Sequence, residues 1–357
     1  MRIGIDARKI YDTGIGRHIS NLVDNLLEVD GGHHYVLFVT PEDFDRLAYP
    51  EERVTKIIEP APKYSLKEHW TLARNADGQR LDIFHAPHYV LPYFMKTPAV
   101  VTVHDAIHVI DPSYGFAART YARVMIGSAV KRARAVITVS QRTKEDLVEL
   151  FEARGDKIRV IPNGGGGDFT RPPEPVIIST LSQMGIQPGY FLFVGSDRPH
   201  KNQKAVAEVL NRLDNSFRFA IAGRTRPEAR KIFEKFGSRV TFVDFVDKTR
   251  MAALYSGAAA LLFPSYHEGF GLPPLEAMAC GTPVVASNRS SIPEVVGDAA
   301  VLVDPDDYES MAYQLREIAM DNRYRAELAR KGHERVKIFS WRKMAEATLE
   351  VYEAAVR

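Results

Sequence analysis

The sequence is poor in cysteine: Cys280 is its single one, so the chain cannot form an internal disulfide. Nothing in it requires an oxidising compartment, and a reducing cytosol is the expected location. No run approaches the ~20 apolar residues of a membrane span, and a charged residue, Asp6, comes too early for the apolar stretch of a signal peptide. We therefore expect a soluble, cytoplasmic protein, with peripheral contact at the inner face of the membrane as its one possible membrane association.

An excess of positive charge is also missing. Lys and Arg together number 47 against 45 Asp and Glu, which gives a formal net charge of +2. A protein that neutralises a phosphate backbone needs a much stronger basic balance, so we expect no nucleic-acid partner.

Several signatures of metal binding and catalysis are absent as well. The sequence has no cysteine cluster and no H-E-x-x-H, so we expect no metal and no other cofactor. It also lacks the G-x-S-x-G turn of a serine hydrolase. Any positive charge that catalysis needs must then come from protein side chains.

What is present is the composition and pattern of two α/β domains. A chain of 357 residues, 45% hydrophobic and 26% charged, is globular in composition and longer than one core usually grows. Short apolar runs alternate with helix-like segments, which is typical of parallel sheets covered by helices on both faces. The predicted strands are Arg2–Ile5, Tyr35–Val39, Ile83–His85, Ala99–His104, Ala135–Val139 and Ile158–Ile161, then Tyr190–Val194, Phe217–Ile221, Val240–Phe242, Ala259–Phe263, Thr282–Ala286 and Ala300–Val303.

A linker is predicted at Asn163–Pro175, where four consecutive glycines, Gly164 to Gly167, precede three prolines. Such a run sustains neither helix nor strand. It separates residues 1–168 from residues 176–338, and we expect each part to form a doubly wound, Rossmann-like domain. Ligands bind beyond the carboxyl ends of parallel strands, so two such sheets facing each other would enclose a cleft lined by strand-end loops.

The most specific signal follows the predicted strand Ala259–Phe263. A loop with two glycines leads into two prolines that open a helix, where a missing N–H matters little. Backbone N–H groups at this helix start form a ready site for a diphosphate. We expect Glu268 near the transferring sugar and Glu276, in the first helical turn, near ribose hydroxyls, although Glu276 could merely complement the helix dipole. The candidate donor-binding residues here are Gly269, Phe270, Gly271, Leu272 and Glu276.

A second candidate loop follows the strand that ends at Val194. It begins with Gly195 and Ser196 and carries two cations, Arg198 and Lys201. Transfer of a glycosyl group builds negative charge on the departing diphosphate, and fixed cations aimed there stabilise the transition state. The alternative is an ordinary solvated basic loop.

Further candidates follow strands of the first half. The turn after the first strand contains Gly14, Gly16 and Arg17, which is only the beginning of a dinucleotide fingerprint. Its backbone can still lie close to a ligand, and Arg17 could contact a phosphate. His88 and His104 each follow another predicted strand, and two histidines at strand ends are stronger candidates than one, although a lone histidine is usually structural.

Taken together, these residues resemble the family 4 retaining glycosyltransferases of the GT-B fold, the glycosyl transferases group 1, and in particular their mannosyltransferase-like members. The likeness covers nearly the whole chain in the expected order. It runs through Asp6, Gly14-Ile15-Gly16-Arg17, His104-Asp105, Val139-Ser140, Ile161-Pro162-Asn163, Val194-Gly195, Lys201, Glu268-Gly269-Phe270-Gly271 with Glu276, and Ser340-Trp341.

The resemblance implies an amino-terminal acceptor domain, a carboxyl-terminal nucleotide-sugar domain, and a final helix within residues 339–357 that crosses back to the first domain. It also implies transfer of a hexose from a nucleoside-diphosphate sugar to a carbohydrate or lipid-linked acceptor. Transfer would retain the anomeric configuration, through front-face attack and without a metal. The form of the amino-terminal loop favours mannose, and GDP-mannose over UDP-glucose.

The resemblance also implies roles for single residues. The E-x7-E pair of the family falls on Glu268 and Glu276, and its phosphate-binding lysine falls on Lys201. Arg198 would help Lys201 to hold the diphosphate, Glu268 would bind sugar hydroxyls, and His104 would orient the sugar or the acceptor. The chain departs from the family in two places. Ser196 stands where many members have arginine, and the run of four glycines predicts a looser hinge.

Other functions fit parts of the pattern. A transferase of the same fold that uses UDP-glucose or UDP-N-acetylglucosamine remains open, as does a protein that binds a nucleotide-sugar without turnover. Sugar-nucleotide epimerases and glycogen phosphorylases share the architecture, but the phosphorylases are much longer. An oxidoreductase would need a third glycine and an acid at the end of the second strand, whereas the chain has Ser20 in place of that glycine and Thr40-Pro41-Glu42 at the end of that strand.

The segment Phe116–Ala135 mixes basic and apolar residues. It could be an amphipathic helix that rests on an anionic membrane, which would suit a lipid-linked acceptor. The alternative is a solvated helix face beside the cleft. Its cations are Arg119, Arg123, Lys131, Arg132 and Arg134.

Overall fold

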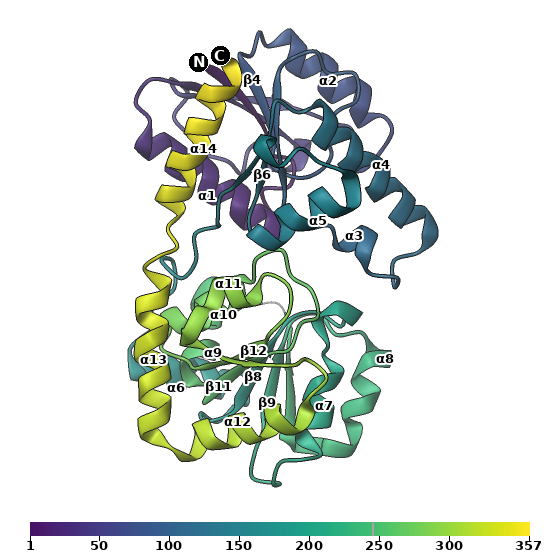
Figure 1. The fold of residues 1–357 in the computed structure, drawn as a ribbon. Coiled ribbons are helices and arrows are strands. Elements are labelled where there is room, and N and C mark those ends of the chain that lie inside the picture. Colours follow the sequence, from purple (N-terminus) through teal and green to yellow (C-terminus); the bar gives the residue numbers. More distant parts are fainter. Residues whose placement is uncertain (245) are drawn as a thin grey trace. The chain divides into compact units, whose positions relative to one another are not determined.

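The computed structural model describes residues 1–244 and 246–357, and the chain forms two compact domains. The first domain consists of residues 1–164 together with 341–357, and the second consists of residues 165–340. Each has a parallel sheet with helices on both of its faces (Figure 1). The polypeptide therefore passes between the domains twice, once at the glycine run and once just before Trp341.

The first domain has a seven-stranded sheet in the order β3-β2-β1-β4-β5-β6-β7, with neighbouring strands parallel throughout. The central strands are buried along their whole length, as expected for strands covered on both faces. The strands are β1 (Arg2–Asp6), β2 (His34–Val39), β3 (Val54–Ile58), β4 (Ile83–Ala86), β5 (Ala99–Val103), β6 (Ala135–Thr138) and β7 (Ile158–Val160).

Strand β3 is absent from the prediction made from the sequence. It lies at the edge of the sheet, where only β2 pairs with it. Val54 is its one buried residue, and Lys56 stands in its middle. Charge on a half-exposed edge strand is a common device against edge-to-edge pairing, but it removes the apolar pattern by which a strand is recognised.

The second domain has a six-stranded parallel sheet in the order β10-β9-β8-β11-β12-β13. All six strands coincide with predicted ones to within two residues at either end. Phe191, Phe193 and Phe219 form the centre of its core, together with aliphatic side chains of the covering helices. The strands are β8 (Phe191–Val194), β9 (Phe219–Ala222), β10 (Val240–Val243), β11 (Ala260–Phe263), β12 (Val284–Ser287) and β13 (Val301–Val303).

Helices form most of the crossover connections that join the parallel strands. In the first domain they are α1 (Gly14–Val29), α2 (Glu68–Gly78), α3 (Ile107–Ile110), α4 (Phe116–Arg132), α5 (Gln141–Phe151) and α14 (Trp341–Val356), with short 3₁₀ helices η1 (Pro41–Asp43) and η2 (Gly155–Lys157). In the second they are α6 (Glu174–Gln183), α7 (Lys204–Leu210), α8 (Pro227–Arg230), α9 (Lys248–Gly257), α10 (Leu272–Ala279), α11 (Ile292–Val296), α12 (Tyr308–Met320) and α13 (Asn322–Val336), with η3 (Pro199–Lys201), η4 (Lys231–Arg239) and η5 (Gly297–Ala299).

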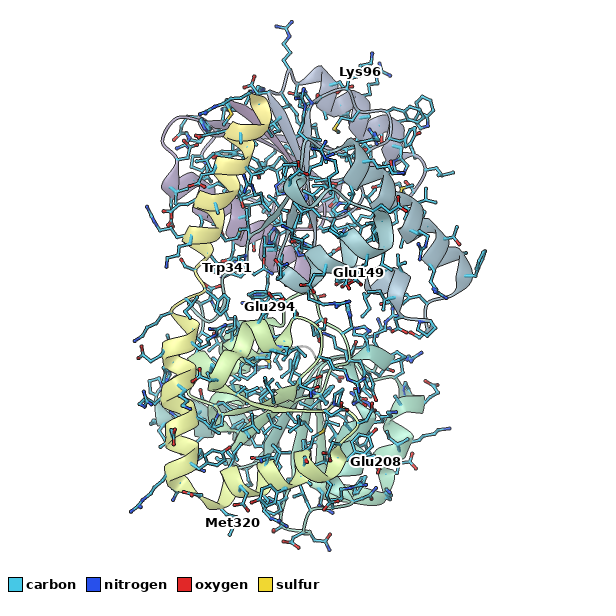
Figure 2. All side chains as sticks on the ribbon, viewed as in Figure 1. Lys96, Glu149, Glu208, Glu294, Met320 and Trp341 are labelled. Atoms are coloured by element: carbon cyan, nitrogen blue, oxygen red, sulfur yellow. The ribbon has the colours of Figure 1, made fainter. Side chains whose placement is uncertain are left out.

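Helix α14 returns the chain to the first domain, where it packs along α1. It begins at the buried Trp341, which is labelled in Figure 2. Further along, the Tyr352 hydroxyl and the Nδ1 atom of His85 are 2.6 Å apart, and the Nε2 atom of His85 is 2.8 Å from the Thr102 hydroxyl. His85 is thus a buried structural residue that attaches the last helix to strands β4 and β5.

The glycine run has a packing role, contrary to the loose hinge predicted from the sequence. A Cβ atom on Gly164 would lie 2.4 Å from the Trp341 ring, and one on Gly165 would lie 2.3 Å from Cδ1 of Leu275. Gly166 has a left-handed φ of +75° and would meet Val336 at 2.4 Å. The residues at these positions are glycine because no side chain fits there. A Cβ atom on Gly167 would have nothing within 4 Å.

Two alanine substitutions test this role of the glycines. Gly165→Ala should lower the thermal midpoint of the second domain by about 2–10 °C, because overpacking a buried site costs about 1–3 kcal/mol. Gly167→Ala is the matched control and should leave the midpoint nearly unchanged. Differential scanning calorimetry of both variants makes the comparison. Equal midpoints for the two would show that the run is merely flexible.

Candidate active site

The loops of the second domain that carry the predicted donor-binding residues meet at the middle of its sheet. Strand β8 pairs with β9 on one side and with β11 on the other, so the strand order reverses between β8 and β11. Ligands of open α/β sheets bind at such a switch point, beyond the carboxyl ends of the strands. The loop after β8 carries Lys201 and the loop after β11 carries Glu268.

Lys201 and Glu268 form an ion pair at this switch point. The Lys201 ammonium donates to both carboxylate oxygens of Glu268, at 2.7 and 2.8 Å. The Lys201 side chain is 23% exposed and that of Glu268 is 11% exposed, so the pair is largely shielded and still reached by solvent. The ring of Phe263, the last residue of β11, lies 5.8 Å from the ammonium. The structure thus places a cation and a carboxylate in contact where a ligand can approach both.

Backbone and hydroxyl hydrogen bonds hold the Glu268 loop in place. The Tyr266 N–H donates to the His200 carbonyl at 2.7 Å and so joins the two loops directly. The Ser290 hydroxyl accepts from the Glu268 N–H at 3.2 Å and donates to its carbonyl at 2.8 Å. The Ser291 hydroxyl is 2.9 Å from the same carbonyl. These serines follow β12, and nothing in the sequence singled them out.

Two residues beside the ion pair have left-handed backbone conformations that non-glycine residues seldom adopt. Asn202, directly after Lys201, has φ of 53°, and Ser290 has φ of 58°. Such conformations cost about 1–3 kcal/mol each and persist only where surrounding contacts enforce them. For Asn202 the contact is a 2.8 Å hydrogen bond from its buried amide to the Pro305 carbonyl. For Ser290 it is the pair of bonds to Glu268.

The glycine after β8 lies against the end of the neighbouring strand. A Cβ atom on Gly223, which follows β9 with φ of +129°, would lie 2.5 Å from the Gly195 carbonyl oxygen. Gly195 itself leaves room for the Lys201 stem, whose Cδ would be 3.6 Å from a Cβ atom there. Ser196 is half-buried in the same loop, and Arg198 is exposed. The close approach of two backbones explains Gly223, which sequence reasoning missed.

Helix α10 starts as predicted, after a glycine and with two early prolines. Gly271 is its N-cap and has a left-handed φ of +103°, which favours glycine. Gly269 and Phe270 are buried just before it, and Leu272, half-buried, is its first residue. Glu276 is the fifth residue of the helix, one turn further than expected. Its Oε2 atom accepts a 2.7 Å hydrogen bond from the buried Tyr255 hydroxyl of α9.

In the first domain, the two glycines at the start of α1 differ in their surroundings. A Cβ atom on Gly16 would lie 2.6 Å from the Ile10 carbonyl oxygen, so Gly16 is needed for packing. A Cβ atom on Gly14 would have nothing within 4 Å. Arg17, half-buried, follows in the same helical turn. Of the three, Gly14 is the residue with open space around it.

His104 is a neutral residue with a fixed tautomer. Its Nε2 atom is 3.0 Å from the Pro87 carbonyl oxygen, which can only accept, so Nε2 carries the proton and Nδ1 is an acceptor. Loss of hydration, and then the neighbouring His18, lowers the pKa of His104 to about 3. The two rings meet edge to face at 4.7 Å. Burial likewise lowers the pKa of His18 to about 4, although its bond to Asn163 opposes the shift.

Histidine titration offers a direct test. We expect His18 and His104 to stay neutral from pH 8 to pH 5, with His104 as the Nε2–H tautomer. Because the unfolded state titrates near pH 6.5, it takes up protons first, and stability should fall as the pH drops from about 6.5 toward 4. Heteronuclear NMR of the ring nitrogens measures both properties. A midpoint near 6.5 for either ring would contradict the assignment.

A buried charge network lies beyond the ends of β1 and β4 in the first domain, where the strand order of that sheet reverses. Arg8 donates to both oxygens of Asp6, at 2.8 and 2.7 Å, and to Glu68 at 2.8 Å. The Nε2 atom of His88 is 3.0 Å from Asp6. Burial alone would raise the pKa of Asp6, but Arg8 and His88 outweigh it and lower the pKa. For Glu68 burial prevails, and the pKa is raised.

Comparison with known proteins identifies the family. The model of the Glycosyltransferase Family 4 matches residues 13–164, and that of the Glycosyl transferases group 1 matches residues 184–335. A D-inositol 3-phosphate glycosyltransferase of Xylanimonas cellulosilytica is 31% identical over 73% of this chain and 67% of its own. The chain belongs to the family 4 glycosyltransferases.

Mannosyltransferases are among the relatives of this family 4 glycosyltransferase. The O-antigen chain mannosyltransferase B of Escherichia coli is 29% identical over 76% of this chain and 74% of its own length. The O-antigen chain mannosyltransferase RfbU of Salmonella typhimurium is 32% identical over 65% of this chain, which spans 63% of that relative.

Solved structures share the fold. A sucrose-phosphate synthase from Thermosynechococcus elongatus superposes with a TM-score of 0.81 at 22% identity, over 99% of this chain and 98% of the other. HepE from Anabaena, in complex with UDP-glucose, superposes with a TM-score of 0.80 at 16% identity, over 99% and 100%. At these identities the likeness concerns the two-domain α/β fold of this glycosyltransferase.

Proposed function

We propose that this glycosyltransferase moves a hexose, with mannose favoured, from a nucleoside-diphosphate sugar to a carbohydrate or lipid-linked acceptor, with retention and without a metal. The observation that carries the proposal is the Lys201–Glu268 ion pair at the switch point of the second sheet. GDP-mannose is the favoured donor, because mannosyltransferases are among the relatives. UDP-glucose is the second candidate, since it is bound in the structurally similar HepE.

In the proposed reaction, the acceptor hydroxyl attacks the anomeric carbon from the face that the diphosphate leaves. The bond from this carbon to the phosphate oxygen breaks as the bond to the acceptor oxygen forms, and the departing phosphate oxygen takes the acceptor's proton. Lys201 stabilises the charge that develops on the diphosphate, and exposed Arg198 adds a second cation. Glu268 fixes the ammonium of Lys201 and accepts from sugar hydroxyls.

Other residues of the proposed site act by binding. The backbone of Gly195, Ser196 and the segment before α10 would lie along the diphosphate, and Glu276 would accept from ribose hydroxyls. In the first domain, neutral His104 has an acceptor, Nδ1, for a hydroxyl of the sugar or acceptor, and the open space beside Gly14 suits close approach of a ligand. Arg17 would contact a phosphate.

The first experiment follows release of nucleoside diphosphate from GDP-mannose, UDP-glucose, UDP-N-acetylglucosamine and ADP-glucose in the presence of EDTA. We expect turnover of one donor, and Lys201→Ala should lower its rate ~100-fold or more, because a preorganised cation is lost from the transition state. Glu268→Gln should lower it too, since the ammonium then loses its ionic partner.

The control for the Lys201 variant is Lys204→Ala. Lys204 is exposed on α7, three residues further along, and its removal should leave the rate unchanged. Near-normal turnover in Lys201→Ala would remove this residue from the site. Dependence of wild-type turnover on added Mg²⁺ would overturn the metal-independent mechanism.

The first domain also offers a surface for peripheral membrane contact. No helix in the described part of the chain is long and apolar enough to cross a bilayer. Helix α4 leaves Phe116 84% and Val124 55% exposed, and Arg123 and Lys131 are exposed on the same helix. A hollow of about 680 Å³ is lined by three cations, one carboxylate and several apolar or aromatic residues, among them Arg123, Lys131, Arg132, Glu152, Val124, Tyr93 and Phe151. We propose that this surface rests on anionic lipid.

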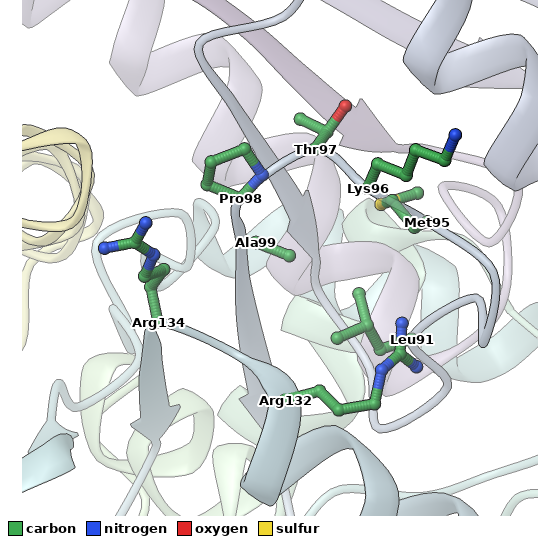
Figure 3. A pocket seen from close by; sticks show the side chains of 8 residues that line it. All are labelled: Leu91, Met95, Lys96, Thr97, Pro98, Ala99, Arg132 and Arg134. Atoms are coloured by element: carbon green, nitrogen blue, oxygen red, sulfur yellow. The ribbon is translucent and has the colours of Figure 1, made fainter.

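A smaller pocket shares Arg132 with this hollow. It has a volume of about 270 Å³, and Lys96, Arg132 and Arg134 are the cations among the lining residues drawn in Figure 3. Arg132 donates to the Pro92 carbonyl at 2.8 Å and lies 5.0 Å from the centre of the Tyr93 ring. Its guanidinium is thus held where it lines both hollows. Together they supply the cations that a lipid phosphate would meet at the surface.

Vesicle flotation tests the membrane contact. The protein should float with vesicles that contain phosphatidylglycerol, and Arg123→Glu with Lys131→Glu should weaken the partitioning at least about tenfold, because each basic residue contributes ~1 kcal/mol. The control is the double variant Arg323→Glu with Arg330→Glu. Both arginines are exposed on α13, so this variant changes the net charge by the same amount, and it should have much less effect on the partitioning. Equal loss in both double variants would show a nonspecific charge effect.

A further inference from the structure

Lys9 is an unusual residue of the first domain. It follows β1, its side chain is 2% exposed, and burial lowers its pKa to about 8. Its ammonium contacts the hydroxyl of Tyr64 and lies 3.6 Å from the centre of that ring. Within the described part of the chain, no carboxylate lies within ion-pair distance of it. Buried lysines are normally paired, so this one needs an explanation.

Other polar atoms nearby are also buried and unsatisfied. Among the described residues, neither the hydroxyl of Tyr121 nor the Oε1 atom of Glu68 has a hydrogen-bond partner. The Tyr121 ring is 6.5 Å from that of Tyr64, and burial, followed by the charge of Glu68, raises the pKa of Tyr121 to about 12. Two donors and one acceptor therefore lie around Tyr64 with unused capacity. Each such group in a native structure calls for a partner.

Tyr64 covers this cluster. Its backbone is left-handed, with φ of 62°, which is strained for an aromatic residue. Its side chain is nevertheless 43% exposed, and its ring meets those of His88, Tyr89 and Tyr121 at 6.2 to 6.5 Å. Because this half-exposed ring contacts the buried Lys9 ammonium, it shields the ammonium from solvent, and a ligand can reach Lys9 only when the ring turns aside.

The charge balance of the cluster indicates what it can hold. Asp6 and Glu68 carry two negative charges, and Arg8 and Lys9 carry two positive ones, all on side chains that are at most 2% exposed. The cluster is therefore close to neutral, and a phosphate or carboxylate brought into it would be an uncompensated buried charge. A sugar ring needs no counter-charge. Its hydroxyls accept from an ammonium or phenol and donate to a carboxylate, and its C–H face packs on an aromatic ring.

We propose that Lys9, Glu68 and Tyr121 form a subsite for a neutral hexose residue of the acceptor, with Tyr64 as its movable aromatic cover. This inference rests on the proposed function, because it assigns the sugar class that the acceptor presents. It also explains the burial of Lys9: the ammonium is kept for a hydroxyl that arrives with the substrate. The switch point between β1 and β4, where this cluster lies, is where ligands of such sheets bind.

The test measures sugar binding directly and needs neither donor nor turnover, so it is independent of whether the proposed transfer occurs. Saturation-transfer NMR on the full chain uses three neutral probes, the methyl glycosides of α-mannose, β-glucose and β-galactose, with mannose 6-phosphate as a charged one. At least one neutral probe should bind, and mannose 6-phosphate should bind more weakly. Lys9→Met and Tyr121→Phe should each weaken binding, by about tenfold or more for Lys9 because its hydrogen bond is charged.

Controls separate binding from folding. Lys67→Met removes an exposed lysine three residues after Tyr64 and should leave sugar binding unchanged. Lys9→Met leaves the buried cluster with one more negative than positive charge, so its thermal midpoint is measured as well, and binding is compared at a temperature at which variant and wild type are both folded. Tyr64→Ala uncovers the subsite and should still bind. Three results would each overturn the proposal. They are that no neutral probe binds to wild type or to Tyr64→Ala, that Lys9→Met binds a neutral probe as well as wild type does, or that mannose 6-phosphate binds more tightly than the neutral probes.

Discussion

The ion pair between Lys201 and Glu268 determines how the loops at the centre of the second sheet are arranged. Both side chains are mostly buried, so removal of either would leave the other charge unpaired in a poorly solvated place. The two strained residues beside it, Asn202 and Ser290, exist because their loops must deliver these side chains to one point. Two further contacts belong to the same arrangement. Ser290 and Ser291, which follow β12, hold the Glu268 loop, and the backbones of Gly195 and Gly223 approach each other after β8 and β9. Four consecutive strand ends thus contribute to one ion pair.

The two domains use the same topology for electrostatically different clusters. In the second domain, the cation at the switch point is partly exposed and its partner is a single carboxylate, which suits a ligand that brings its own negative charge. In the first domain, the switch point holds a fully buried set of two carboxylates and two cations, which suits a ligand without charge. The two charge patterns are those that the proposed division between a charged donor and a neutral acceptor requires.

The sequence predicted the fold class and twelve of the thirteen strands in residues 1–244 and 246–357, because buried parallel strands are short apolar runs. It missed β3, whose edge position admits Lys56.

Lys201 and Glu268 could be recognised because each stands in a loop with glycine or proline after an apolar strand. Ser290 and Ser291 could not, since a pair of serines has no pattern until the loop is folded against Glu268. Lys9 could not either, because a lysine is expected at the surface and only the fold shows that it is buried. The glycine run was misread, since flexible and tightly packed glycines look alike in a sequence.

The passage of α14 back to the first domain has a consequence for biosynthesis. Residues 165–340 are contiguous and can fold as soon as they leave the ribosome, whereas the first domain lacks one of its covering helices until residues 341–357 have emerged. Until then the surfaces of α1, β4 and β5 that pack against α14 lack their cover, and His85 lacks the Tyr352 hydroxyl. The domain that is synthesised first is therefore the one that is completed last, and apolar surface exposed in the interval favours aggregation.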